Sequence, residues 1–452
     1  MSLFSSLRRE QREAIGLLQI GTFLEYFDLM LYVHMAVLLN DLFFPKTDSH
    51  TAALLSAFAF CSTFVLRPFG ALLFGYIGDN IGRKPTVILT TMVMAFSCIV
   101  MANLPTYSQI GITAAWILSL CRVLQGISSM GEMVGAEIYV TEITKPPERY
   151  FSVSLLNIAA VLGSTVPLAV ASLVTTQGFN WRIAFWIGAG IAVIGSIARS
   201  RLRETPDFVD MKRRMQKAIE DSSRDGLGRA ADLLKSTNPL WREKVSKKTA
   251  LSYFLISCAW PACFYFSFMY CGNILKDTFG FTGEQVIHQN LMVSIVDLVG
   301  VIIISFLSQK IHPLKILKAK IMIFFPFMLI CPYLLSHLNN SFELLLIQSF
   351  SIFFSLTAIP AGAVFLIRFP IFKRFTAYSL LYAFSRTLMY IVTSFGLIYL
   401  IQLFGHWGLL FIMIPVGIGF FLGINHFEKL EYKTRHDNPE TALRKTLTSS
   451  AR

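Results

Sequence analysis

The sequence predicts an all-α membrane protein that crosses the bilayer twelve times in two six-helix bundles. Of its 452 residues, 54% are hydrophobic and only 15% are charged, against roughly 25% charged in soluble domains. Apolar runs long enough to span a bilayer as helices recur along the chain, each needing about 20 residues. The runs are continuous and do not alternate with polar residues, so a transmembrane barrel is not expected.

The apolar runs fall into two groups of six. The first group covers residues 14–40, 51–77, 86–103, 109–140, 151–176 and 181–199, and the second covers 249–275, 286–308, 316–337, 342–367, 376–403 and 407–427. The chain therefore divides into an N-terminal bundle (1–198), a basic linker (199–248), a C-terminal bundle (249–428) and a tail (429–452).

Lysine and arginine predict the orientation. Outside the spans they fall almost entirely on one set of alternate loops, which includes the linker, the tail and the loop carrying Lys310, Lys315, Lys318 and Lys320. The opposite loops hold only Lys46 and Lys276. By the positive-inside rule, both termini and the linker are cytoplasmic. The excess of 40 Lys+Arg over 27 Asp+Glu is thus explained by topology, and we expect no nucleic-acid partner.

The loop between the second and third spans reads GYIGDNIGRK, residues 75–84. Gly75, Gly78 and Gly82 permit a tight turn and close helix approach, and Asp79 is an acid placed to meet a helix N-terminus or a basic side chain. A merely basic cytoplasmic loop is the plainer interpretation. The pattern resembles the signature loop of the major facilitator superfamily.

Other motifs resemble one branch of that superfamily, the metabolite:proton symporters, which include transporters of proline/betaine, 2-oxoglutarate, citrate and shikimate. They are Glu25-Tyr26-Phe27-Asp28 with Tyr32, Arg67-Pro68-Phe69-Gly70, Arg122 with Gln125-Gly126 and Gly131-Glu132, Trp181-Arg182, and Arg203-Glu204-Thr205-Pro206-Asp207-Phe208. The chain departs from the family at Arg368, which stands where an acid is usual, and at Ala383, which stands where Asn is frequent. These departures leave the solute open.

The resemblance implies a conformational gate at the cytoplasmic face. Asp79 would contact the N-terminus of the eleventh span, and Arg83 would pair with Glu142 at the end of the fourth. Together with Gly75 and Gly82 these residues would lock one conformation, and breaking their contacts would accompany the change between outward- and inward-open states.

Charged residues at mid-bilayer are costly and usually functional. A rise of 1.5 Å per residue puts Glu25 and Asp28 about 16–21 Å into the first span and Arg122 about 18 Å into the fourth. Glu25, Asp28 and Tyr32 share one helix face, as do Arg122 and Gln125. We expect Arg122 to face Asp28 or Glu25 across a central cavity, where it would hold a solute carboxylate or release the acid for protonation. A structural ion pair is the alternative.

The second half offers a similar arrangement. Asp297 in the eighth span and Arg386 in the eleventh lie at similar depth and would form a second pair across the cavity, or a structural one. We expect a packing or gating role for Glu132 and Glu137. The stripe of Trp260, Phe264 and Phe268 would cage a quaternary ammonium group or simply pack between helices.

The sequence therefore predicts a secondary active transporter of a bacterial inner membrane. It would take up a small carboxylate-bearing organic solute, such as betaine/proline or a di- or tricarboxylate, with protons by alternating access. The alternatives are a proton-antiporting exporter of a metabolite, siderophore or drug, and a transporter-like solute sensor. We expect a monomer with no enzymatic activity, no cofactor and no metal; no phosphate-binding Gly-rich loop supports ATP-driven transport.

Overall fold

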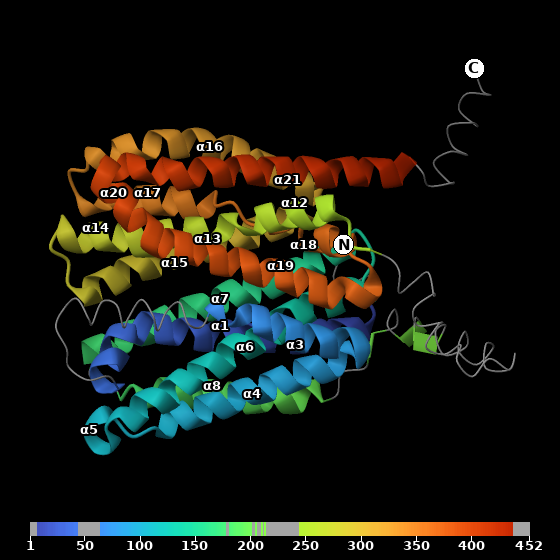
Figure 1. The fold of residues 1–452 in the computed structure, drawn as a ribbon, viewed down its shortest axis with the longest axis horizontal. Coiled ribbons are helices and arrows are strands. Elements are labelled where there is room, and N and C mark those ends of the chain that lie inside the picture. Colours follow the sequence, from blue (N-terminus) through green and yellow to red (C-terminus); the bar gives the residue numbers. More distant parts are fainter. Residues whose placement is uncertain are drawn as a thin grey trace, which may run out of the picture.

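The computed structural model describes residues 7–43, 64–177, 180–200, 204–205, 209–210, 212–213 and 244–436. All regular structure in these ranges is helical. Figure 1 shows two stacked bundles whose helices run along the long axis of the molecule, the N-terminal one in blue to green and the C-terminal one in yellow to red. Seven of the described helical segments are by themselves long and apolar enough to cross a membrane.

The N-terminal bundle contains the first six predicted spans. Phe27, Leu31 and Phe185 are among the residues of its core. Residues 51–63 of the second span lie outside the described residues, as does most of the linker. The helices are α1 (Arg9–Phe43), α3 (Arg67–Asn80), α4 (Arg83–Asn103), the short α5 (Tyr107–Ile110), α6 (Ile112–Ile143), α7 (Glu148–Gln177) and α8 (Arg182–Arg199).

The C-terminal bundle contains the other six spans, several of them in pieces. The seventh span consists of α12 (Lys247–Ser257), α13 (Ala259–Phe264), the π-helical η2 (Tyr265–Tyr270) and α14 (Cys271–Asp277). Then follow α15 (Gly283–Leu307), α16 (Pro313–Ser336), α17 (Ser341–Phe353), α18 (Gly362–Leu366), α19 (Ile371–Ile391), η3 (Val392–Gly396), α20 (Leu397–Phe404), η4 (Gly405–Leu409) and α21 (Leu410–His436).

The last helix is longer than its hydropathy predicts. The apolar run ends near residue 427, but α21 continues to His436. Two ion pairs hold its polar end to the bundle, Lys318 with Glu428 and Arg368 with Glu431, the latter at 2.5 Å. Side-chain pairing therefore extends the helix past the predicted bundle boundary at 428.

The prediction of one continuous tenth span over 342–367 is wrong. The helix α17 ends at Phe353 and α18 begins at Gly362, with non-helical backbone between them. Pro360 lacks an N–H and disfavours helical geometry at Ile359, which explains the break. Hydropathy could not reveal it because residues 354–361 remain apolar. Irregular backbone at membrane depth is tolerated where it is buried in protein or lines a cavity.

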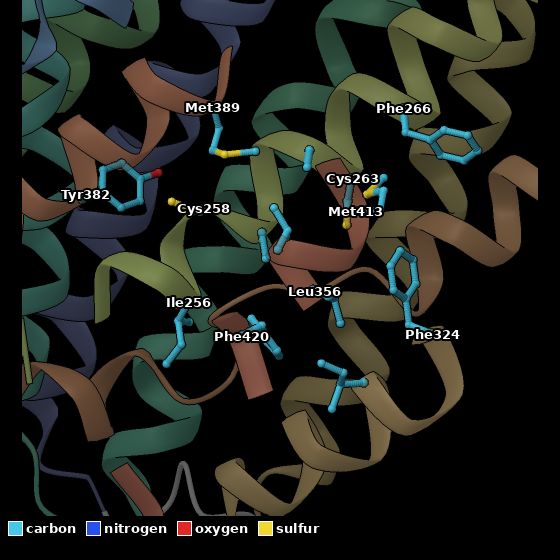
Figure 2. Packing of buried hydrophobic residues seen from close by; sticks show 14 of the residues in the cluster. Ile256, Cys258, Cys263, Phe266, Phe324, Leu356, Tyr382, Met389, Met413 and Phe420 are labelled. Carbon is cyan, nitrogen blue, oxygen red and sulfur yellow. The ribbon is translucent and has the colours of Figure 1, made fainter. Parts of the chain in front are cut away.

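The non-helical segment is anchored in the core of the C-terminal bundle. Figure 2 shows Leu356 there among labelled side chains of other elements, including Phe324, Met413 and Phe420, which belong to the same buried cluster. Cys258 and Cys263 are in this cluster too. All free cysteines of the described residues are buried, as is usual for cysteines that pack as small hydrophobic side chains.

The two bundles meet along two antiparallel helix pairs. Between α3 and α19, the ring of Phe64 lies 4.2 Å from that of Tyr390 at one end, and Gly75 meets Thr376 at the other. Between α7 and α15, the rings of Phe151 and Phe306 are 5.4 Å apart, and the hydroxyls of Thr165 and Ser294 are hydrogen-bonded at 2.7 Å. These two seams enclose the region in which a site for a ligand can form.

Candidate functional site

A cavity of about 100 Å³ lies between the two bundles. The first bundle contributes lining from α1, α6 and α7, and the second from α12, α13, η2, α15, α19 and the segment 354–361. Its charged lining residues are Glu137, Asp297 and Arg386, which are 6%, 7% and 9% exposed. The aromatic lining residues are Tyr26, Tyr253, Trp260, Phe264, Phe268, Tyr378 and Tyr382.

The helix α19 runs along the cavity and makes contacts with the other bundle at both of its ends. Thr376 in its second turn binds Asp79 of the other bundle. Tyr378, Tyr382 and Arg386 then line the cavity. Tyr390 finally joins an apolar cluster that draws on both bundles, made of Leu29, Met30, Phe64, Phe264, Phe268, Val293, Ile352 and Tyr390. Polar contacts therefore lie beyond one end of the cavity, and this apolar cluster, of which Met30, Phe264 and Phe268 also line the cavity, closes the other.

Arg386 is held by tyrosines. Its guanidinium lies over the Tyr382 ring, 4.6 Å from the centroid, and it also interacts electrostatically with Tyr26 and Tyr390. The hydroxyls of Tyr26 and Tyr382 both contact the Met133 sulfur, at 3.0 and 3.3 Å. A guanidinium on an aromatic ring keeps its N–H donors available at the ring's edge, so it can bind an anionic group of a ligand.

The expected pair between Asp297 and Arg386 does not form within the described residues. Both side chains line the cavity, but Asp297 interacts electrostatically with Lys320 of α16, while Arg386 lies over Tyr382. The prediction that Lys320 belongs to a basic loop is wrong. Because α16 begins at Pro313, Lys320 lies two turns inside the helix and is only 7% exposed.

Glu137 is a cavity residue that the sequence did not single out as one. It lies on α6 and lines the cavity, and its Oε2 accepts a hydrogen bond from the Tyr378 hydroxyl of α19 at 3.2 Å. Tyr378 stacks in turn on Tyr253, with ring centroids 4.3 Å apart. The available signal was position: Glu137 lies one helical turn after Met133, on the same face of α6.

Asp28 and Arg122 lie inside the N-terminal bundle. Asp28 is fully buried, its carboxylate accepts a hydrogen bond from the Cys98 thiol, and its Oδ1 would be 2.7 Å from a Cβ at Gly188. Arg122 is 3% exposed, donates to Gln125 Oε1 at 3.0 Å and interacts electrostatically with Asp28.

The two residues are neighbours, as expected, but they do not face each other across the central cavity, whose lining includes neither of them. Helical periodicity predicts which residues share a face but not which neighbour that face meets, and here it meets α4 and α8. Glu25 is also buried, 2% exposed and absent from the lining. The side chain of Tyr32 lies outside the described residues.

A charge network joins the bundles at the end where α3 meets α4. We define it as Asp79, Arg83, Glu142, Arg374 and Thr376. Arg83 is fully buried and donates to Asp79 at 3.0 Å, to Glu142 at 3.4 Å and to the Ile371 carbonyl at 3.0 Å. Arg374 of α19 donates to the same Glu142 oxygen at 3.1 Å. Two carboxylates thus balance two guanidiniums, which reduces the cost of burying them.

The segment after α8 also binds this network. Both Glu204 oxygens accept hydrogen bonds from the first backbone N–H groups of α4, those of Arg83 and Lys84, at 3.0 and 3.2 Å. The Thr205 hydroxyl donates to Glu142 at 2.8 Å. Gly82 precedes α4 with a φ of 152°, a conformation that favours glycine, and a Cβ there would collide with Glu204.

Glycines allow α3 to approach α19. A Cβ at Gly75 would lie 2.8 Å from the Thr376 Cα, and a Cβ at Gly78 would overlap the Phe375 ring. All five predicted gating residues, Gly75, Asp79, Gly82, Arg83 and Glu142, therefore lie in or against the charge network.

Comparisons with known proteins agree with this architecture. A family model described as Major Facilitator Superfamily matches residues 18–393. The chain is 33% identical over 222 residues to a proline/betaine transporter of Salmonella typhimurium, covering 48% of this chain and 44% of that protein. It is 36% identical over 197 residues to an inner membrane metabolite transport protein of Escherichia coli, covering 42% and 45%. It thus matches less than half the length of these curated relatives.

Solved structures share the fold at low identity. A proton:xylose symporter bound to 6-bromo-6-deoxy-D-glucose superimposes with a TM-score of 0.72 at 16% identity, covering 93% of this chain and 95% of the other. The human organic anion transporter MFSD10 gives a TM-score of 0.64 at 16% identity, covering 92% and 100%.

Proposed function

The chain belongs to the Major Facilitator Superfamily, and from that premise we propose that it is a secondary active transporter that takes up a small carboxylate-bearing solute together with protons. The observation that carries this proposal is Arg386, which is buried in the wall of a cavity between the two bundles and held by tyrosines without an ion pair among the described residues. Alternating access would expose this cavity to each side of the membrane in turn.

Arg386 would bind the solute carboxylate. A guanidinium pairs with a carboxylate through two parallel hydrogen bonds, and the surrounding aromatic rings would cover the apolar part of a small solute. The named solutes of a relative from Dickeya dadantii, a glycine betaine/proline/ectoine/pipecolic acid transporter that is 33% identical over 223 residues, all carry a carboxylate. Glycine betaine and proline are therefore the first solutes to test, and di- and tricarboxylates the second.

The Asp28–Arg122 pair would couple transport to protons. Asp28 is sealed in the N-terminal bundle, where a charged carboxylate depends on a nearby cation for stability. Protonation would release Arg122 from Asp28 and leave it on Gln125, its hydrogen-bond partner. Such a rearrangement repacks α6 against α1 and thereby links proton binding to bundle movement. Glu25 remains the alternative proton carrier.

The charge network would act as the cytoplasmic gate, with the linker and both termini on the same side. The basic residues of the loops at that side support this orientation. The protein would then be a multi-pass monomer of a bacterial inner membrane, and the arrangement described above would be its state closed toward the cytoplasm.

Solute-induced proton entry into proteoliposomes tests the proposal. The panel is glycine betaine, proline, 2-oxoglutarate, citrate and shikimate, each with wild type, Asp28→Asn and Arg122→Ala. We expect one solute class to acidify the lumen with wild type only. Proton exit on solute addition would instead support an exporter, and solute binding without transport would support a sensor.

A further inference from the structure

We propose that Glu137 binds a proton inside the solute cavity and that its protonation loosens the contact between the two bundles at Tyr378. The coupling part of this inference rests on the proposed proton-linked transport, whereas proton binding by Glu137 stands without it. Glu137 would be a second proton-binding carboxyl group besides the buried Asp28. It lies at a different place and has a different structural partner.

Glu137 belongs to one bundle and binds a side chain of the other. Its Oε2 accepts the Tyr378 hydroxyl at 3.2 Å, and its Oε1 lies 3.9 Å from the position of a Cβ at Gly362 of α18. It also lines the cavity. A ligand or proton that enters the cavity therefore reaches a carboxyl group that spans the seam between α6 and α19.

Among the described residues, the titratable groups that face Glu137 are tyrosines, and no cation forms a salt bridge with its carboxylate. Tyr378 of α19 and Tyr253 of α12 face it, and Asn157 of α7 contributes to the same cavity wall. Arg386 interacts with it electrostatically, but two turns further along α19, and no salt bridge joins them within the described residues. A carboxylate removed from water without a close cation is costly, and binding a proton relieves that cost.

Glu142 provides the contrast on the same helix. Five residues after Glu137, it is equally buried at 6% exposure, yet Arg83 and Arg374 both donate to it. Two guanidiniums thus lie against its carboxyl group, whereas no salt bridge is formed by Glu137 among the described residues. The two glutamates of α6 therefore differ in their partners and not in their burial.

Protonation of Glu137 changes the strength of its bond to Tyr378. An ionised carboxylate accepts a hydrogen bond from a phenol more strongly than a neutral carboxyl group does. Tyr378 is two residues from Thr376, which Asp79 binds. Proton binding in the cavity therefore weakens the seam immediately beside the charge network, where the bundles must part.

Infrared spectroscopy of purified protein tests proton binding without any solute. We expect wild type to show the C=O stretch of a protonated carboxyl group at neutral pH, and Glu137→Gln to lose part of that band. Glu13→Gln is the control, since Glu13 is exposed and paired with Arg9, and it should leave the band intact. Identical bands in wild type and Glu137→Gln would overturn the proposal, whatever the solute is.

Transport of radiolabelled glycine betaine tests the coupling. In Glu137→Gln we expect proton-driven accumulation to fall about tenfold while solute exchange across the membrane persists. In Tyr378→Phe we expect the pH profile of accumulation to shift. Tyr333→Phe, at an exposed tyrosine of α16, should match wild type. Equal loss of exchange and accumulation in Glu137→Gln would show a structural or solute-binding role and overturn the coupling. No transport by wild type would count against the proposed function, and the infrared result would then decide on Glu137 alone.

Discussion

Asp79 of one bundle accepts two hydrogen bonds from Thr376 of the other, in the second turn of α19. The Thr376 N–H donates at 2.9 Å and its hydroxyl at 2.8 Å, both to Oδ2, while Oδ1 accepts the Phe375 N–H at 3.1 Å. A hydrogen bond from an N–H or O–H group to an ionised carboxylate is charge-assisted and stronger than a neutral one. These hydrogen bonds exist only while the bundles are together at this end, so they stabilise that state selectively.

Replacing Asp79 by asparagine should weaken this closed state. The amide keeps the size of the carboxylate but loses its charge and one acceptor, and a hydrogen bond to a charged group contributes about 1.5–3 kcal/mol. We expect transport to fall about tenfold with the folded yield unchanged, measured as initial uptake rate and by size-exclusion chromatography. Asn80→Ala is the control, because among the described residues Asn80 donates to the Tyr76 carbonyl of its own helix and not to the other bundle. Equal rates in the two variants would refute the role of Asp79 in joining the bundles.

Glu142→Gln should destabilise the folded protein strongly. Glu142 is the common partner of Arg83 and Arg374, so its neutralisation leaves two buried guanidiniums with less compensation, at a cost of about 3–5 kcal/mol. Thermal unfolding followed with a thiol-reactive dye suits this chain because the free cysteines of its described residues are buried. In Glu428→Gln, which removes a partly exposed pair with Lys318, the expected loss is below about 1 kcal/mol. Similar melting temperatures for the two variants would contradict this ranking.

A larger residue at Gly78 should hold the bundles apart at the charge network. Its Cβ would overlap the Phe375 ring, and packed interiors accommodate such overlap only by moving an element, at about 1–3 kcal/mol. With a reporter cysteine at Asn157 in the cavity wall, Gly78→Val should speed maleimide labelling in detergent. Gly190→Val should not, since a Cβ at Gly190 meets nothing within 4 Å. Labelling as slow as in the parent would show that this seam does not control access to the cavity.

Hydropathy predicts the order of the apolar segments that form helices in the described residues, because it depends on local composition. The contacts of the charge network were also predictable, since Asp79, Arg83 and Glu142 belong to a loop that resembles a known signature and to the helix beside it. The placement of Asp28 and Arg122 was not, because the face that a helix presents is set by its rotation against neighbours far away in the sequence. Here Asp28 points toward Cys98 of α4 and Gly188 of α8 and therefore does not line the cavity.

Two further features depended on backbone detail that composition does not carry. The break at residues 354–361 occurs in an apolar run, so only Pro360 hinted at it. Lys320 has the charge of a loop residue, but α16 begins early enough to bury it near Asp297. The sequence shows that Lys320 and Asp297 are charged, but only the fold shows that they are neighbours in the C-terminal bundle.

Arg386→Lys should weaken solute binding while preserving charge. Lysine cannot form two parallel bonds to a carboxylate. Its ammonium group also lacks the planar surface of the guanidinium, whose carbon lies 4.6 Å from the centroid of the Tyr382 ring. We expect the KM for glycine betaine, or for whichever carboxylate proves to be transported, to rise about tenfold or more. Arg182→Lys makes the same change at an arginine that lies 4.5 Å over Trp181 but outside the cavity lining. Equal KM values in the two variants would move the carboxylate site away from Arg386, whereas a selective rise for Arg386→Lys would locate it at the tyrosine-rich wall that α1 and α19 form together.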